Sequence, residues 1–195
     1  MARALEGIKV VDFSWVLAGP ALTRYLADYG AEVVLVESAV HPDIMRTSPP
    51  YRDGQPGLNR STLWADFHAD KYGLALNMNI PEGIDVARRL ISRGDIVVEN
   101  FIPGTLDKWG LGYNELVKLK PDIILVSISL YGQTGPYARR GGWGSFAEGM
   151  SGFWNLIGWG DRGPSSYQSV IGDALVPFFG LSAVMAALDC RKKTG

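Results

Sequence analysis

The chain has 195 residues, of which 19 are basic and 20 acidic, so it can form one sizeable core but has no strong net field to hold nucleic acid or an anionic membrane. Cys190 is the only cysteine, which excludes an internal disulfide and a cysteine-based metal site. We therefore expect small-molecule chemistry in a reducing, cytoplasmic setting, without a metal, a nucleic-acid partner or a membrane partner.

Membrane association is also disfavoured by local sequence. The start of the chain runs into a strand pattern and lacks the apolar core of a signal peptide. The longest apolar span, residues 174–188, is shorter than the roughly 18–20 residues that cross a bilayer, and it contains Pro177. The sequence thus predicts no membrane-spanning segment.

Runs of β-branched residues alternate along the chain with helical patterns that proline or glycine bounds. In chain order, the sequence predicts a strand at residues 8–13, a helix at 20–29, a strand at 32–37, a helix at 81–93, a strand at 95–99, a helix at 114–120, a strand at 122–129, and helices at 145–158 and 174–188. This alternation indicates an α/β fold, an open, mainly parallel, Rossmann-like sheet with helices on both faces. A proline- and glycine-rich insertion at residues 41–74 interrupts it, and its length indicates that it shapes a site.

The ends of two predicted strands are the first candidate site. Ligands of open parallel sheets gather at the carboxyl ends of the strands. There, residues 14–20 and 100–104 form turns that enter helices, and their main-chain N–H groups would suit an anionic or nucleotide-like group. Ordinary strand-to-helix loops have the same composition, so both interpretations stand. A literal G-x-G-x-x-G at residues 158–163 follows a helix, so we reject it as a dinucleotide-binding motif.

Asp173 is a lone carboxylate in the apolar stretch of residues 169–180, directly before a buried helical pattern. An aspartate in that place is a good helix N-cap, which would lower its pKa. Alternatively it does chemistry. Local sequence leaves both roles open.

Five segments in order carry a resemblance to a known family: residues 10–20, 26–33, 98–104, 129–137 and 173–195. Together they resemble the family III CoA-transferases, which include formyl-CoA transferase, carnitine CoA-transferase and the related α-methylacyl-CoA racemases. Family members are longer. The resemblance therefore implies that residues 1–195 are the N-terminal part of the CoA-binding α/β domain, ending in the helix after the catalytic aspartate, with the linker and small domain absent and the family fold incomplete.

The resemblance also implies an activity, the transfer of CoA from an acyl-CoA to a small carboxylic acid. Asp173 falls at the family's catalytic aspartate, which forms an anhydride and then an aspartyl-CoA thioester. CoA is a substrate here, and no cofactor is permanently bound. Family positions for CoA contacts fall on Val16, Ala18, Leu76, Asn100, Phe101 and Lys108. Lys71 is either a further phosphate contact or a surface lysine.

The family resemblance leaves alternatives. It implies an interlocked homodimer or a hetero-oligomer in the complete enzyme. A non-catalytic CoA-fold subunit of a hetero-oligomer is kept open by departures from the family pattern at Ser38, Gly144 and Glu148. An acyl-CoA racemase fits less well, because the family's racemases need a histidine in a Gly-His-Asp step that here reads Gly142-Trp143-Gly144.

Overall fold

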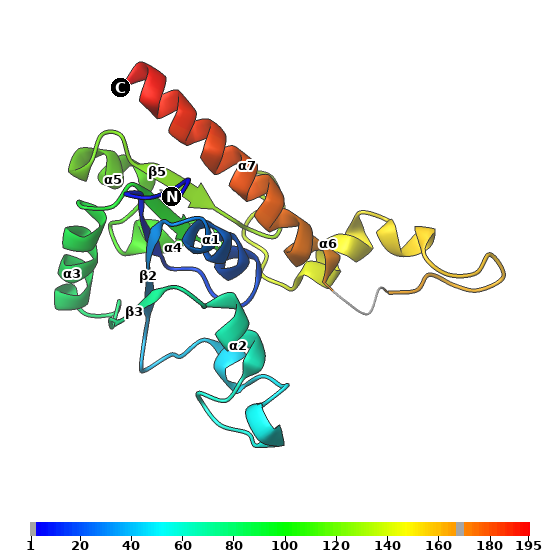
Figure 1. Ribbon diagram of the computed structural model, residues 1–195. Coiled ribbons are helices and arrows are strands. Elements are labelled where there is room, and N and C mark those ends of the chain that lie inside the picture. Colours follow the sequence, from blue (N-terminus) through cyan, green and yellow to red (C-terminus); the bar gives the residue numbers. More distant parts are fainter. Residues whose placement is uncertain (1–2, 167–169) are drawn as a thin grey trace.

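The computed structural model describes residues 3–166 and 170–195 (Figure 1). Ser169, at the start of the apolar stretch before Asp173, lies outside the described residues. Five parallel strands form one sheet in the order β3-β2-β1-β4-β5. The strands are β1 (Lys9–Asp12), β2 (Glu32–Glu37), β3 (Tyr72–Ala75), β4 (Ile96–Glu99) and β5 (Ile124–Ser127). The predicted open, parallel α/β fold is confirmed, and the strand order reverses between β1 and β4.

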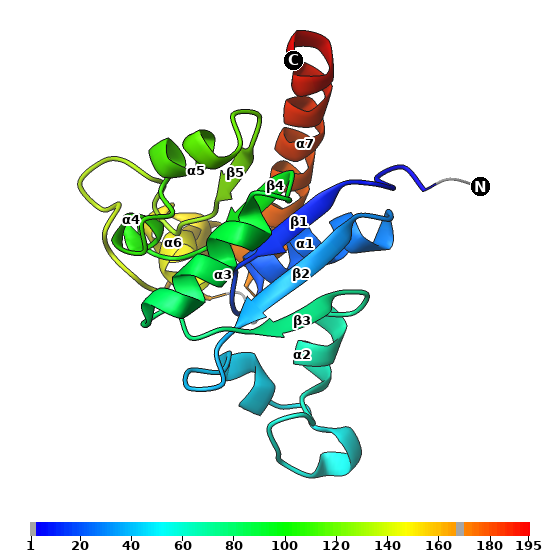
Figure 2. The same ribbon diagram turned by 90° about the vertical axis from the view of Figure 1, so that its left-hand side faces the viewer.

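Alternate residues of the central strands feed two separate cores, because successive side chains of a strand point to opposite faces. Val10, Val33 and Val98 pack with the helices α1 (Ala18–Asp28) and α7 (Ile171–Thr194) on one face. Val11, Val36 and Val97 pack with α3 (Pro81–Ile91) and α5 (Tyr113–Leu119) on the other face. Figure 2 shows α3 and α5 on one side of the sheet and α1 and α7 on the other. The sheet is thus covered on both faces, as its continuous apolar runs predict.

Helix ends follow the predicted punctuation to within a few residues. α3 starts with Pro81 at its first position, where proline costs no hydrogen bond, and ends before Gly94. The predicted helix at 145–158 is shorter, because Gly152 takes a left-handed conformation (φ 79°) after α6. The helices are α1 (Ala18–Asp28), α2 (Thr62–Phe67), α3 (Pro81–Ile91), α4 (Thr105–Lys108), α5 (Tyr113–Leu119), α6 (Gly144–Met150) and α7 (Ile171–Thr194), with short 3-10 turns at Ile44–Thr47, Arg52–Gly54 and Phe153–Leu156.

The insertion at 41–74 contains one strand that the sequence pattern did not reveal. β3 (Tyr72–Ala75) pairs with β2 at the edge of the sheet, and most of its residues are exposed. An exposed edge strand needs no alternation of apolar and polar residues, so its sequence pattern does not predict a strand. Figure 2 shows the rest of the insertion lying below β3, with α2 beside that strand. The insertion therefore extends the sheet and places its polar side chains next to β1.

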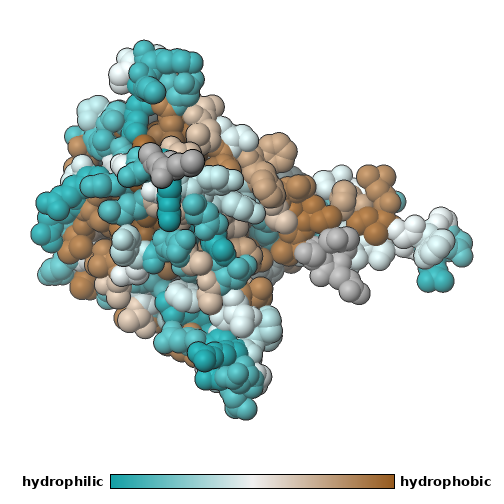
Figure 3. Space-filling model, viewed as in Figure 1, coloured by the Kyte–Doolittle hydropathy of each residue, from teal (hydrophilic) through white to brown (hydrophobic). Residues whose placement is uncertain are grey.

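α7 is longer than the predicted 174–188. It covers Ile171–Thr194, and by length and composition alone it is long and apolar enough to cross a membrane, so the length argument against a spanning helix is wrong. Val184 packs into the core shared with α1, yet only 11% of the apolar window is buried. Figure 3 shows apolar residues gathered over α7 and α6. Large exposed side chains on α7 are Leu175, Phe178, Phe179 and Met185.

This exposed face predicts self-association of the 195-residue chain, because contiguous apolar surface of this kind is normally covered. We expect light scattering to report a mass above that of the monomer, and Phe179→Ser to lower it, since that ring is 74% exposed. Leu58→Ser, at an exposed leucine in the insertion, is the matched control and should leave the mass unchanged. A clean wild-type monomer at high concentration would refute the prediction.

Candidate functional site

The turns that follow β1 and β4 meet at the place where the strand order reverses. The Trp15 N–H donates to Asn100 Oδ1 at 2.8 Å, and Asn100 Nδ2 donates to the Trp15 carbonyl at 2.6 Å. The rings of Trp15 and Phe101 lie edge to face at 5.9 Å. Ligands of doubly wound sheets bind outside such a reversal. The structure thus brings the two predicted turns to one crevice.

A cavity of about 180 Å³ opens at these strand ends. Four of its twelve lining residues are Phe or Trp, and the Phe101 ring lies edge to face against Trp109 at 5.6 Å. The remaining walls come from the ends of β2 and β3. The lining residues are Phe13, Trp15, Val36, Glu37, Ser38, His41, Leu76, Met78, Asn79, Phe101, Thr105 and Trp109. This first pocket offers flat apolar surfaces, which suit a ring or an aliphatic chain.

Three main-chain N–H groups of the first turn already donate to side chains of the same protein. Ser14 donates to Asp12 Oδ1 at 2.9 Å, Trp15 donates to Asn100, and Val16 donates to Asp43 Oδ2 at 2.9 Å. In the second turn the Phe101 N–H donates to Glu99 Oε2 at 2.9 Å. The interpretation as anion ligands is therefore wrong for these four N–H groups in this conformation, because each one already has an acceptor. For the other N–H groups of the two turns, such as that of Ala18 at the start of α1, it stays a prediction.

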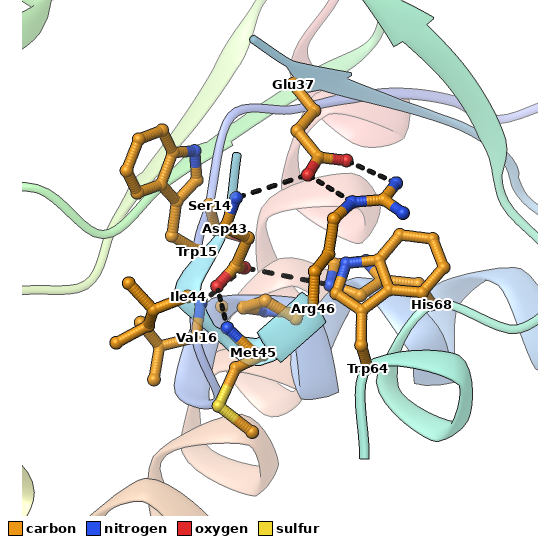
Figure 4. A network of polar contacts seen from close by, with 12 residues as sticks. Ser14, Trp15, Val16, Glu37, Asp43, Ile44, Met45, Arg46, Trp64 and His68 are labelled. Carbon is orange, nitrogen blue, oxygen red and sulfur yellow. Dashed lines mark hydrogen bonds and ion pairs between the residues drawn. The ribbon is translucent and has the colours of Figure 1, made fainter. Parts of the chain in front are cut away.

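Asp43 belongs to a buried polar network between the insertion and the first turn (Figure 4). Its backbone N–H donates to Glu37 Oε1 at 3.2 Å, and Arg46 forms two hydrogen bonds with Glu37, at 2.5 and 2.7 Å. The Arg46 guanidinium lies 3.6 Å from the centre of the Trp64 ring, which stacks on His68. Burial raises the pKa of Asp43. The sequence pattern indicated a site-shaping insertion but none of these residues.

Lys71 is neither a surface lysine nor a free phosphate ligand. Its side chain is 1% exposed, and its ammonium donates to Asp12 Oδ2 at 3.2 Å and to Thr23 Oγ1 at 2.7 Å. Burial lowers the pKa of Lys71, while the Asp12 carboxylate opposes that shift. The predictions of a surface lysine and of a phosphate contact are therefore both wrong, because the Lys71 ammonium is buried and paired with the Asp12 carboxylate.

Asp173 lines a second, larger pocket of about 630 Å³ between α1, α2 and α7. The wall is mainly apolar, with Tyr25 and Phe178 in contact at 5.5 Å between ring centres. Its lining residues are Leu17, Ala21, Tyr25, Leu63, Phe67, Ser145, Val170, Asp173, Ala174, Pro177 and Phe178. Trp15 lines the first pocket and Leu17 the second, so the turn at Val16 lies between the two.

Asp173 is not the N-cap of α7. The cap position is Val170, and Asp173 lies inside the first turn, half-buried. Glu148 of α6 is the residue that accepts a first-turn N–H, from Gly172 at 3.1 Å. Burial, reinforced by the nearby Glu148 carboxylate, raises the pKa of Asp173, the opposite of the shift that a cap would cause. A half-buried carboxylate without the capping role is free to act on a ligand.

Gly144 makes room for the Asp173 carboxyl. A Cβ built on Gly144 would lie 2.6 Å from Asp173 Oδ2, so a side chain at this position would displace that carboxyl. A histidine–aspartate step cannot be accommodated here without moving Asp173. Among the described residues that line this pocket there is no histidine, so they do not supply the imidazole that the family's racemases need.

The predicted ligand residues fall into three groups. Leu76 and Phe101 line the first pocket, and Val16 and Asn100 form the turn contact beside it. Ala18 is buried at the start of α1, and Lys108 is exposed on α4, and neither lines these pockets. Sequence reasoning missed Trp109 and Phe67, whose aromatic side chains near a predicted strand end and in the insertion were the available signal. Within residues 3–166 and 170–195, no group of three or more His, Cys, Asp and Glu side chains could hold a metal ion.

Comparisons with known proteins agree with this architecture. The model of the family described as CoA-transferase family III matches residues 5–195. The chain is 37% identical over 193 residues to the succinyl-CoA–D-citramalate CoA-transferase of Chloroflexus aurantiacus, covering 99% of this chain and 47% of that protein. It is 37% identical over 194 residues to the succinyl-CoA:glutarate CoA-transferase of Mus musculus, covering 99% of this chain and 43% of that protein.

A solved structure gives the same result. The crystal structure of a CAIB/BAIF family protein from Brucella suis superposes with a TM-score of 0.88 at 38% identity, over 100% of this chain and 51% of that chain. The present chain therefore spans about half the length of the relatives that it matches. A family model that matches nearly all of its residues, together with these relatives, shows that the chain belongs to the family III CoA-transferases.

Proposed function

We propose that the protein moves CoA between carboxylic acids, with Asp173 as the nucleophile. The observation that carries the proposal is the position of Asp173, a half-buried carboxylate in the first turn of α7 at the wall of a 630 Å³ pocket. Its raised pKa makes the carboxylate a stronger nucleophile once it is ionised. The N-terminal end of α7 favours negative charge, which steadies the oxyanion of each tetrahedral intermediate.

The proposed reaction proceeds through two kinds of covalent intermediate. An Asp173 oxygen attacks the thioester carbonyl of the donor, the C–S bond breaks, and an acyl-aspartyl anhydride and CoA thiolate form. The thiolate attacks the aspartyl carbonyl, releases the donor acid as a carboxylate and leaves an aspartyl-CoA thioester. The acceptor carboxylate attacks that thioester and expels CoA thiolate. The thiolate then takes the acceptor acyl group and frees Asp173.

For CoA itself, we place the nucleotide end at the first pocket and the thioester at the second. Leu76 and Phe101 then contact the ligand at the strand ends, and Asn100 acts by holding Trp15. The pantetheine passes the turn at Val16 on its way to Asp173. Lys108 meets a phosphate from the exposed surface of α4 as a point charge. Ala18, which is buried, contributes through its main chain.

The relatives support a substrate class and an assembly. Those reported above are named for the transfer of CoA from succinyl-CoA to D-citramalate and to glutarate, so we propose an acyl-CoA donor such as succinyl-CoA and a small carboxylic acid as the acceptor. Two further relatives of the chain are named as the alpha and beta subunits of a succinyl-CoA–L-malate CoA-transferase. Accordingly, we propose that residues 1–195 work in an interlocked homodimer or a hetero-oligomer, in the cytoplasm.

Covalent trapping tests the proposal. We expect incubation with succinyl-CoA followed by hydroxylamine to convert the Asp173 carboxyl to a hydroxamate, because hydroxylamine attacks anhydrides and thioesters but not a free carboxylate. Peptide mass spectrometry locates the modification. Two other carboxyls are internal controls and should stay unmodified: Glu148 of α6, which lies near Asp173, and Asp189, which is on α7 with Asp173. CoA binding without any adduct at Asp173 would refute catalysis and favour the alternative, a non-catalytic CoA-fold subunit.

A further inference from the structure

Val16 has a backbone conformation that its residue type disfavours. Its φ is 68°, in the left-handed region, which is rare for residues other than glycine and a genuine outlier for a β-branched side chain. Such a conformation persists only where surrounding contacts impose it, and it occurs preferentially at functional sites. Val16 lies in the turn between the two pockets, so what imposes its conformation also shapes both pocket walls.

Asp43 supplies the contact that fixes Val16. Its Oδ2 accepts the Val16 N–H at 2.9 Å, and its Oδ1 accepts the Met45 N–H at 2.9 Å. The side chain is 3% exposed, so both bonds are shielded from water. Glu37 accepts the Asp43 backbone N–H at 3.2 Å. Asp43 thus joins the strand-end turn to the insertion through three of its own atoms.

His68 stands behind Asp43. Its Nε2 lies 4.0 Å from Asp43 Oδ2, and its Nδ1 lies 3.4 Å from Lys71 Nζ (Figure 4 shows His68 beside Asp43). A lysine ammonium only donates, so Nδ1 accepts and the ring proton sits on Nε2, which faces Asp43. Nε2 is buried and has no hydrogen-bond partner among the described residues. Burial, with Lys71 next, lowers the pKa of His68 to about 4, so the ring is neutral at physiological pH.

We propose that Asp43, which lies next to His68, is a positioning residue that locks Val16 in the left-handed conformation and thereby preorganises the CoA site. The inference rests on the proposed function, because it takes CoA to run past this turn. Preorganisation raises affinity by removing the cost of ordering the site when the ligand binds. Asp43 and His68 line neither pocket, and the bond from Asp43 to Glu37, which lines the first pocket, comes from the Asp43 main chain. The effect of the Asp43 carboxylate on CoA therefore passes through Val16.

A double-mutant cycle separates this role from general structural support. Asp43→Asn keeps the shape but has one carbonyl oxygen for two N–H donors, so it frees one of them. We expect it to speed hydrogen exchange at the Val16 amide and to weaken CoA binding, each by about 10-fold or more. Glycine adopts a positive φ without strain. In the Val16→Gly background, Asp43→Asn should therefore change CoA affinity by less than about threefold.

Val40→Gly is the matched control, at an exposed valine of the same insertion region. It should leave the full effect of Asp43→Asn on CoA affinity in place. His68→Gln, which removes the ring next to Asp43, should weaken CoA binding less than Asp43→Asn does. This variant replaces Asp43→Asn in the test if circular dichroism shows that Asp43→Asn folds poorly. Unchanged Val16 exchange, unchanged CoA affinity, or a loss that Val16→Gly does not relieve would each overturn the inference. If the wild type binds no CoA, the proposed function falls with it, a result distinct from a neutral Asp43→Asn.

Discussion

Replacing Asp173 by Asn is expected to lower the rate of CoA transfer by about 10³-fold or more, because an amide cannot form the anhydride. The change should leave stability within about 1 kcal/mol. Asparagine loses a favourable interaction with the N-terminal end of α7 but also removes a buried charge beside Glu148. Steady-state kinetics and urea unfolding of the same preparation check both expectations.

The pH dependence carries a second signature of Asp173. Its folded pKa lies above the ordinary value of 3.8, because of burial and then Glu148. As pH falls through that raised value, the nucleophile is protonated, so transfer should decline with an acid limb above pH 3.8. The native state holds this proton more tightly than the unfolded state, so between the two pKa values the contribution of Asp173 to stability falls as pH rises. Asp173→Asn should abolish that slope.

A matched control is available on the same helix. Asp189 is exposed and pairs with Lys193 at 2.6 Å, four residues along α7. Asp189→Asn makes the same chemical change and should alter transfer less than about twofold, because exposed ion pairs contribute little. Near-normal transfer by Asp173→Asn would move the chemistry to another residue. An equal loss in both variants would point to damage of α7 instead.

Replacing Lys71 by Met is expected to have the largest effect on stability, a loss of about 3 kcal/mol or more. Asp12 is 0% exposed, and the substitution would leave its carboxylate buried without the opposite charge. Ser14 and Thr23 still donate to Asp12, which limits the loss but leaves the charge unbalanced. Urea unfolding measures the change in the free energy of unfolding.

Two comparisons make the Lys71 experiment decisive. Asp12→Asn/Lys71→Met removes both charges, so it should be more stable than the sum of the single losses predicts. Lys118→Met breaks an exposed pair with Glu115, 2.6 Å long, and should cost less than about 1 kcal/mol. Equal effects of Lys71→Met and Lys118→Met would contradict the buried pair.

The sequence by itself predicted four of the five strands and the main helices. Most residues of β1, β2 and β4 are buried, and those of β5 are partly buried against the two cores, so runs of β-branched residues mark all four strands. Pro81 and Gly94 bounded α3 in the same local way. The five ordered segments identified the family. These signals are local, because backbone preferences and periodicity act over a few neighbouring residues.

The tertiary structure decided what depends on residues far apart in the chain. β3 exists because β2 offers an edge, and Lys71 is buried because Asp12 lies opposite it. Glu148, from another helix, takes the role at the start of α7 that the local pattern favoured for Asp173. The sequence placed the turn at Val16 but not its conformation, since that depends on Asp43, 27 positions away. Burial and long-range hydrogen bonds form only when distant segments pack together, so a local sequence pattern does not predict them.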